Sequence, residues 1–183
     1  MLEEPAGIAR TDSGRPIADE LLLRIPFVVD LLLALVAQLP PGSPLRRRFI
    51  LWGLKRGLDA AVRKDYDFQR LGYEPDVEIF LSGPAGVGFE ASYRGHQGLR
   101  ESTIDFFENF AETRVTVKRV LDARDRWVAE METLGQGKES AVPFATNWGT
   151  VFYVSARGKI RRQDILWAED GWSQALEAAG LSE

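Results

Sequence analysis

The sequence contains no cysteine and a single histidine, His96, among its 183 residues. The absence of cysteine excludes disulfide bonds, thiolate nucleophiles and cysteine-ligated zinc. With one imidazole, the chain has no histidine-rich metal site and no histidine pair. We therefore expect no bound metal.

Long apolar runs are also missing. The longest one, residues 21–39, is interrupted by Arg24, Pro26 and Asp30. Only nine residues separate Asp30 from Pro40, whereas a helix that spans a bilayer needs about 20. The segment is expected to form one or two apolar helices, with Pro26 in a first helical turn and Pro40 at the end.

These helices have three possible roles. They can pack over the rest of the chain, form the arm of a homodimer, or lie on a membrane surface with help from the basic residues 46–48. Because Asp30 lies in the middle of the segment, we favour packing or dimerisation and do not expect membrane association.

The start of the chain and its charge give further exclusions. Glu3 and Glu4 stand where a signal peptide is basic, so we expect a soluble cytoplasmic protein. The net charge of −4 argues against general binding of nucleic acid. That balance is uneven, since residues 1–64 hold ten basic and seven acidic side chains and the remainder holds thirteen and twenty. The basic residues of 46–64 alternate with apolar ones, which favours a solvated charged face of a helix over a phosphate-binding stripe.

Periodicity then predicts the order of the elements. Ile50, Leu54 and Leu58 recur at helical spacing, which indicates an amphipathic helix. The expected elements are helices over 45–64 and 67–71, strands over 76–81 and 89–93 around a turn at 82–88, a helix over 99–110, strands over 115–121, 126–134, 143–154 and 159–166, and a last helix between an N-cap at Asp170 and Gly180. This order predicts an α+β fold with helices on one face of a curved sheet.

Three stretches follow one another in a characteristic order. They are Arg63-Lys64-Asp65-Tyr66-Asp67 before Pro75-Asp76-Val77-Glu78, then Tyr93-Arg94-Gly95-His96-Gln97-Gly98, and finally Gly158-Lys159-Ile160 with Ala175-Leu176-Glu177-Ala178-Ala179-Gly180-Leu181. This ordered set resembles the SnoaL-like branch of the NTF2-like superfamily. The resemblance implies a SnoaL-like domain over residues 45–183 and an N-terminal extension with apolar helices over residues 1–44.

The resemblance implies a cone-shaped, curved antiparallel sheet wrapped by helices, with a hydrophobic pocket at the wide end. Such proteins include polyketide cyclases, ketosteroid isomerases, scytalone dehydratases and limonene-epoxide hydrolases, as well as non-catalytic binders, and homodimers are common. The tyrosine and two aspartates of the ketosteroid isomerases fall near Gly57, Leu81 and Thr150, none of which transfers a proton. Steroid isomerisation is therefore disfavoured, and the chemistry has to be argued from other residues.

The last predicted strand offers a candidate catalytic pair. Arg162 and Asp164 are two residues apart and share a face of the strand. The arginine keeps the carboxylate ionised, which suits a general base with Asp164 as the base and Arg162 orienting it. A salt bridge on the outer face of the sheet is the competing interpretation. His96 is a further candidate, because it is the one side chain with an ordinary pKa near neutrality.

Glu130 is a candidate for the binding site on the strand 126–134. It shares a face with Glu132, opposite Met131. If the Met131 face lines the pocket, both glutamates are solvated, and in the reverse case they are candidate bases.

Four more residues are candidates for substrate binding. Tyr93, Trp148 and Phe106 could form an aromatic wall, and Asn147 could donate to an oxyanion. Core packing is the competing interpretation for the aromatic residues.

Other motifs are absent. The glycine-rich residues 83–88 match neither a dinucleotide fingerprint nor a P-loop, so we expect no cofactor. The leading hypothesis is a protein that binds a small apolar molecule. A cofactor-independent acid/base enzyme of the cyclase, isomerase or epoxide-hydrolase type and a non-catalytic binder are both compatible with it, and a protein-interaction module that uses residues 17–39 or a sheet face is the alternative.

Overall fold

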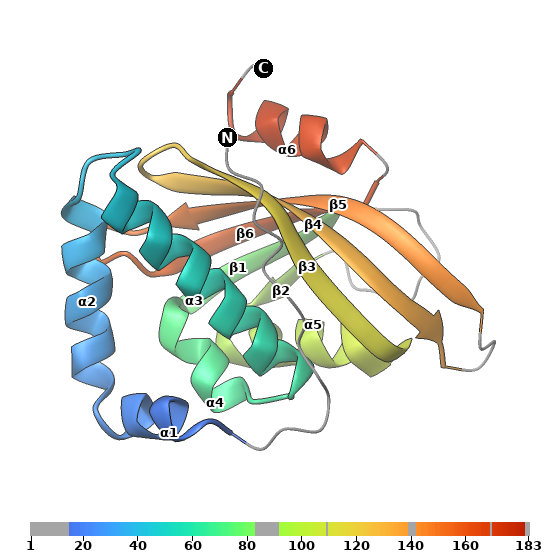
Figure 1. The fold of residues 1–183 in the computed structure, drawn as a ribbon, viewed down its shortest axis with the longest axis horizontal. Coiled ribbons are helices and arrows are strands. Elements are labelled where there is room, and N and C mark those ends of the chain that lie inside the picture. Colours follow the sequence, from blue (N-terminus) through green and yellow to red (C-terminus); the bar gives the residue numbers. More distant parts are fainter. Residues whose placement is uncertain (1–14, 83–91, 109, 139–141, 169, 182–183) are drawn as a thin grey trace.

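The computed structural model describes residues 15–82, 92–108, 110–138, 142–168 and 170–181. In this part of the chain, a curved sheet of six strands in the order β2-β1-β6-β5-β4-β3 is wrapped by helices (Figure 1). The strands are β1 (Tyr73–Ser82), β2 (Ser92–Arg94), β3 (Phe110–Asp122), β4 (Arg126–Gly137), β5 (Pro143–Val154) and β6 (Ile160–Leu166). The helices are α1 (Ile17–Arg24), α2 (Pro26–Gln38), α3 (Pro44–Val62), α4 (Tyr66–Gln69), the 3₁₀ turn η1 (Arg70–Gly72), α5 (Gly95–Glu108) and α6 (Gly171–Ala178).

The α+β fold is confirmed, and the predicted order of helices and strands agrees with the observed one. The turn predicted at 82–88 and the first part of the strand predicted at 89–93 lie largely outside the described residues. Gly180 takes the expected left-handed conformation after α6, with φ at +67°. Asp170 is the N-cap residue of α6, as predicted, but its side chain accepts from the Gln174 amide nitrogen at 2.7 Å and makes no capping bond to the backbone.

The sheet is mixed, which corrects the expectation of an antiparallel one. Strands β3 to β6 pair in antiparallel order along the chain, as expected. However, β1 pairs with β6 in parallel, with Glu78 opposite Arg162 and Ile79 opposite Gln163. This pairing joins strands that are far apart in sequence, so no local pattern predicts it.

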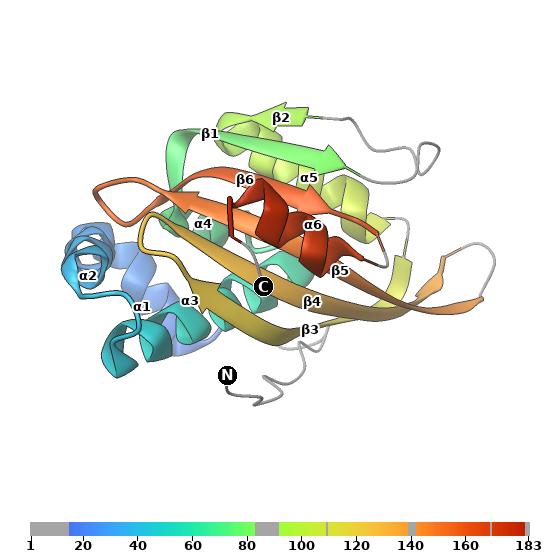
Figure 2. The same ribbon diagram turned by 90° about the horizontal axis from the view of Figure 1, so that it is seen from above.

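Helix α6 corrects a second expectation, since it lies on the convex face of the sheet while α3, α4 and α5 lie on the concave face (Figure 2). Val128 and Val151 point to this outer side and pack with Leu176 of α6. The helix comes close because Gly149 has no side chain; a Cβ there would overlap the carbonyl oxygen of Gly171.

The main core lies on the concave side. On β4, Ala129 and Met131 face inward and are fully buried, while Val128 faces α6. The sequence left open which face of this strand points into the cone, and the packing of α6 on the other face decides it.

The N-terminal helices α1 and α2 pack against the rest of the chain. Asp19 of α1 is fully buried and forms ion pairs with Arg56 of α3 and with Arg63, the residue that follows α3. Asp30 of α2 pairs with Lys159 in the loop before β6 at 2.7 Å. None of the helices in the described residues is long and apolar enough to cross a membrane.

Candidate functional site

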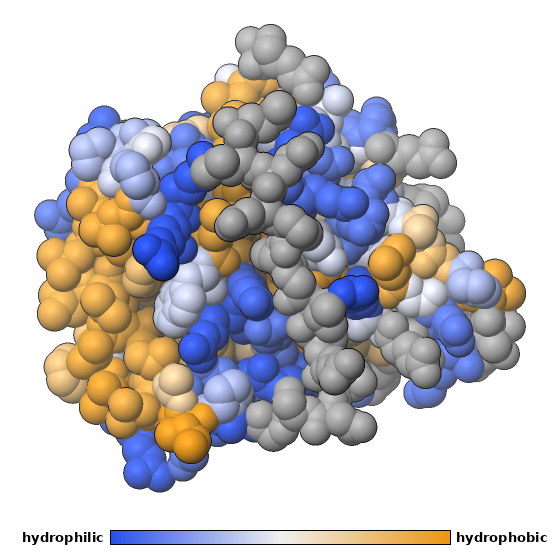
Figure 3. Space-filling view, viewed as in Figure 1, coloured by the Kyte–Doolittle hydropathy of each residue, from blue (hydrophilic) through white to orange (hydrophobic). Residues whose placement is uncertain are grey.

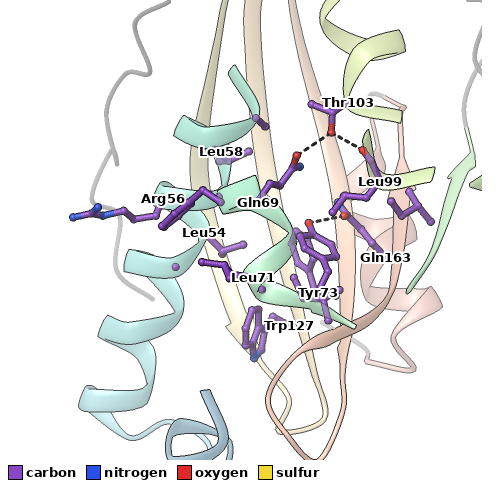
Figure 4. A pocket seen from close by; sticks show the side chains of 18 of the residues that line it. Leu54, Arg56, Leu58, Gln69, Leu71, Tyr73, Leu99, Thr103, Trp127 and Gln163 are labelled. Carbon is purple, nitrogen blue, oxygen red and sulfur yellow. Dashed lines mark hydrogen bonds between the residues drawn. The ribbon is translucent and has the colours of Figure 1, made fainter. Parts of the chain in front are cut away.

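A cavity of about 220 Å³ lies on the concave side of the sheet (Figure 4). Its walls come from α3, the α4–η1 segment, α5 and the inward faces of β1, β4, β5 and β6. Most of the lining side chains are aliphatic or aromatic. The strands contribute through their alternation, which points every second side chain inward, for example Ile79, Met131 and Phe152.

Aromatic side chains shape one wall of the cavity. Trp148 stacks on Trp167 with ring centres 5.5 Å apart, and Phe106 meets Trp167 edge to face at 5.2 Å. The indole nitrogen of Trp148 donates to the Thr133 hydroxyl at 2.9 Å, so the ring is held in one orientation. These three aromatic residues all line the cavity.

Three polar side chains, Tyr73, Gln163 and Thr150, form a chain of polar contacts beside the cavity, which we call the polar relay. The Tyr73 hydroxyl donates to the side-chain oxygen of Gln163 at 3.1 Å (Figure 4). The Gln163 nitrogen lies 3.4 Å from the Thr150 hydroxyl. Burial raises the pKa of Tyr73 well above its ordinary value of 10. The phenol therefore stays neutral at physiological pH, and its oxygen retains lone pairs that can accept a hydrogen bond.

A second polar group lies on the α4–α5 wall. The Thr103 hydroxyl donates to the Leu99 carbonyl oxygen at 2.8 Å and lies 3.3 Å from the side-chain oxygen of Gln69. Because a hydroxyl has one proton, the Gln69 amide keeps most of its hydrogen-bonding capacity. Trp127 also lines the cavity, and its buried indole nitrogen has no hydrogen-bond partner among the described residues.

Helices α1 and α2 cover one end of the cavity. Leu22 of α1 and Val29 and Leu33 of α2 contribute to its wall. Gly158 lies directly beneath α2, and a Cβ there would overlap the Leu33 carbonyl oxygen. The N-terminal segment therefore completes the cavity.

The candidate pair Arg162 and Asp164 forms, but it does not line the cavity. Arg162 Nε is 2.7 Å from Asp164 Oδ1, and its NH2 is 3.0 Å from Oδ2. The guanidinium also lies over the rings of Phe80 and Tyr153, 4.5 and 5.4 Å from their centres. This is the outer face of the sheet, since the intervening Gln163 is the residue that points into the cavity.

His96 and Tyr93 also lie outside the cavity wall. His96 lies in the first turn of α5, with Nε2 3.3 Å from the Tyr73 carbonyl oxygen. Tyr93 is buried in the core, where its hydroxyl donates to Asp105 at 2.8 Å.

The remaining candidates divide between the two faces of the sheet. Trp148 and Phe106 line the cavity. Asn147 is exposed on β5, and Glu130 pairs with Arg119 at 2.6 Å on the outer face of β4. Because Met131 faces inward, the expectation that Glu130 lies on the outward face is the one that holds.

Sequence analysis missed polar residues that line the cavity, among them Gln69, Tyr73 and Gln163. Gln163 had a usable signal, because its neighbours Arg162 and Asp164 share the opposite face of the strand. Tyr73 had none, since the strand was predicted to begin after it, at residue 76.

Acid/base groups are scarce in this wall. Among the described lining residues, the ionisable side chains are Arg56 and Tyr73, and no carboxylate or imidazole is present. In the same part of the chain, no group of three histidine, aspartate or glutamate side chains is placed to hold a metal ion.

An α+β cone with an interior apolar cavity defines a recognised class of fold, and comparison with solved structures identifies it. No protein-family model and no curated protein matches the chain. TerC, crystallised with polyporic acid, matches with a TM-score of 0.57 and 16% identity, over 69% of this chain and 97% of that one. An NTF2-like protein from Burkholderia pseudomallei K96243 matches with a TM-score of 0.56 and 14% identity, over 68% and 95%.

A third structure is a Mycobacterium tuberculosis protein in complex with estradiol-17beta-hemisuccinate. It matches with a TM-score of 0.51 and 13% identity, over 66% of this chain and 95% of that one. The chain has the NTF2-like fold, as the sequence resemblance implied.

Proposed function

We propose that this chain binds a small apolar molecule with one or two rings in the cavity and does not convert it chemically. The observation that carries the proposal is the lining, which is apolar and aromatic apart from a few neutral amides and hydroxyls and Arg56. Such a lining, with a small number of placed polar groups, is typical of ligand sites.

The size of the cavity limits the ligand. A volume of about 220 Å³ exceeds the roughly 150 Å³ cavity that holds benzene. It is below the ~300 Å³ at which sites for drug-sized ligands begin. One or two fused rings therefore match the space better than a steroid does.

The polar relay favours a ligand with one hydroxyl group. Tyr73 and Gln163 are neutral, and together they offer an acceptor and an amide that is already oriented by Thr150. A charged ligand would lose its hydration against this wall with no opposite charge beside the relay. A neutral phenol or alcohol loses less hydration free energy when it enters the cavity.

The absence of a base argues against catalysis. General acid/base chemistry needs a group of suitable pKa within hydrogen-bond reach of the substrate. Asp164, the candidate base, lies on the outer face, where it is held by Arg162. The described lining offers no replacement for it.

The ligands of two neighbours are compatible with this proposal. TerC was crystallised with polyporic acid, and the mycobacterial protein is in complex with estradiol-17beta-hemisuccinate. Both are statements about those proteins, and they support only that this fold accommodates organic ligands.

Titration with 1-naphthol tests the proposal, with tryptophan fluorescence as the measurement. Gly57 lies on the inward side of α3 and lines the cavity, and a Cβ there would meet nothing within 4 Å. Gly57→Leu is expected to fill the space and abolish binding. Gly57→Ala is the matched control; it keeps binding and gains about 1 kcal/mol of helix stability.

Three outcomes would contradict the proposal. The first is a fluorescence signal that 1-naphthol and naphthalene both leave unchanged in the wild type. The second is equal binding by Gly57→Leu and wild type, which would place the ligand elsewhere. Turnover of a bound ligand that disappears in Asp164→Asn would restore the enzyme hypothesis.

A further inference from the structure

One end of the molecule presents an unusual number of exposed apolar side chains. On α2, Phe27, Leu31 and Leu35 recur at four-residue steps and are 67%, 57% and 52% exposed. Leu45 and Trp52 of α3 are also exposed. We call these five residues the apolar face. Figure 3 shows apolar residues gathered over α1 and α2, and α2 forms an edge of the molecule in Figures 1 and 2.

The segment that contains α1, α2 and α3 holds the positive charge of an otherwise acidic chain. Residues 15–64 contain nine Lys and Arg and four Asp and Glu, a balance of +5, whereas the whole chain has −4. Arg48 and Lys55 are exposed on α3 and form no ion pair with any described residue. Positive charge and exposed apolar side chains therefore coincide on α3, whereas α2 itself has no lysine or arginine.

Three of the four acidic side chains in this region are already paired. Asp19 is buried against Arg56 and Arg63, Glu20 pairs with Arg24 at 2.7 Å, and Asp30 pairs with Lys159 at 2.7 Å. Asp30 was the reason for expecting no membrane association, and its ion pair removes that reason. The outward side of α2 has no unpaired charge.

We propose that the apolar face docks on an anionic lipid surface. Apolar and aromatic side chains beside basic ones are the pattern of helices that lie in the plane of a membrane interface. Anionic headgroups complement Arg48 and Lys55, and Phe27 and Trp52 are of the types that favour the interface. A symmetric contact between two copies is less favourable, since it brings the two sets of basic side chains toward one another.

Helices α1 and α2 are also the cover of the cavity. Leu22, Val29 and Leu33 line the cavity, while the α2 part of the apolar face, Phe27, Leu31 and Leu35, is exposed to solvent. When the protein is docked, helix α2, which covers one end of the cavity together with α1, therefore lies against the lipid surface. This consequence rests on the proposed function, whereas the docking itself does not.

Flotation with lipid vesicles tests the docking, without any added cavity ligand. Wild type is expected to float with vesicles of equal parts phosphatidylcholine and phosphatidylglycerol and not with pure phosphatidylcholine. The triple variant Phe27→Ser, Leu31→Ser, Leu35→Ser is expected to bind more than about tenfold more weakly. Its side chains are mostly exposed, so the fold is retained, which circular dichroism checks.

Two matched controls make the same kinds of substitution at exposed positions away from the apolar face. They test whether the position of the substitution, and not its type alone, determines lipid binding. Leu121→Ser with Val142→Ser removes exposed apolar side chains elsewhere and is expected to float as wild type does. Arg48→Glu with Lys55→Glu is expected to weaken binding by about tenfold or more, whereas Arg94→Glu with Arg161→Glu, the same charge change on exposed strand positions, is not.

Several results would overturn the proposal. One is failure of the wild type to float, and another is flotation that the triple variant or the Arg48–Lys55 variant leaves unchanged. A third is a dimer in light scattering that the triple variant converts to a monomer, because a second copy then covers this face. Loss of naphthol binding with normal flotation would count against the proposed function alone.

Discussion

Arg46 of α3 and Asp122 at the end of β3 form a bidentate ion pair, with Nε 2.7 Å from Oδ2 and NH2 3.0 Å from Oδ1. The guanidinium is 2% exposed. Its remaining nitrogen donates to carbonyl groups at the C-terminal end of α2, those of Ala37 at 2.9 Å and of the C-cap residue Leu39 at 3.2 Å. One buried cation therefore joins the cover of the cavity to the sheet and satisfies carbonyls that a helix end leaves unpaired.

Arg46→Ala is expected to destabilise the protein by about 3–5 kcal/mol, because it leaves Asp122 and the α2 carbonyls without their partner. The measurement is urea unfolding, together with hydrogen exchange of the α2 amides, which should become faster. Arg48→Ala, an exposed neighbour, is the control and should change stability by less than about 0.5 kcal/mol. Equal effects of the two substitutions would contradict this role for Arg46.

Gly158 gives a second test of how α2 is seated. Gly158 and Gly42 both have φ at +78°, so an alanine is strained equally at either position. Only at Gly158 does the added Cβ overlap α2, at the Leu33 carbonyl oxygen; at Gly42 it meets nothing within 4 Å. Gly42→Ala is expected to cost about 1–2 kcal/mol, and Gly158→Ala clearly more.

Limited proteolysis near α2, one of the two helices that cover the cavity, is the second measurement for these two glycine variants. Gly158→Ala should increase proteolysis between α2 and α3, whereas Gly42→Ala should not do so beyond its loss of stability. If the two variants have the same stability and the same cleavage rate, α2 is not held against Gly158.

The sequence predicted the elements well because their signals are local. The helical spacing of Ile50 and Leu54 and the alternation around Trp148 each depend on neighbours a few residues away. The packing of β1 beside β6 and of α6 on the outer face depends on contacts between distant segments. These are the features that local patterns left undecided.

Local patterns also could not show whether the predicted catalytic pair lines the cavity. Spacing places Arg162 and Asp164 on one face of β6, and the structure has them there as a salt bridge. The spacing alone does not show which face of the sheet points into the cone, because both faces of β4 and β5 carry large apolar residues. The cavity instead holds Gln163, whose side chain has no distinctive motif.

Tyr73 makes stability sensitive to alkaline pH. Burial raises its pKa in the folded state above the ordinary value of 10, so the neutral phenol is favoured by folding and the ionised one by unfolding. The stabilisation is complete below about pH 10 and is lost as the pH rises toward the folded-state pKa.

Tyr73→Phe is expected to cost about 1–2 kcal/mol at pH 7, since Gln163 loses a buried donor. The gap in unfolding free energy between wild type and variant should stay constant up to about pH 9 and shrink above pH 10. A gap that persists unchanged at pH 11 would mean that Tyr73 ionises as freely in the folded protein as in the unfolded one.

Asp65 makes stability sensitive to acid. Burial alone would raise its pKa, but the hydrogen bonds from Arg15 and from the Phe68 amide outweigh this, and the pKa falls below its ordinary value. Arg15 Nε and NH2 lie 2.6 and 2.5 Å from the two carboxylate oxygens, and the Phe68 nitrogen lies 3.2 Å from Oδ1 as a cap of α4. Such a group stabilises the fold above pH 4 and loses its contribution as the pH falls through the lowered pKa.

Asp65→Asn is expected to cost about 1–2 kcal/mol at pH 7, from the weaker cap and the lost ion pair. Its difference from wild type in unfolding free energy should decrease between about pH 4 and pH 2, because wild-type Asp65 becomes protonated there. Asp67→Asn is the control: this exposed carboxylate pairs with Arg70 at 3.3 Å, and its loss should cost less than about 0.5 kcal/mol. A wild type that is no more acid-sensitive than Asp65→Asn would show that Arg15 does not hold this carboxylate in solution, and would leave the start of the N-terminal cover without its link to α4.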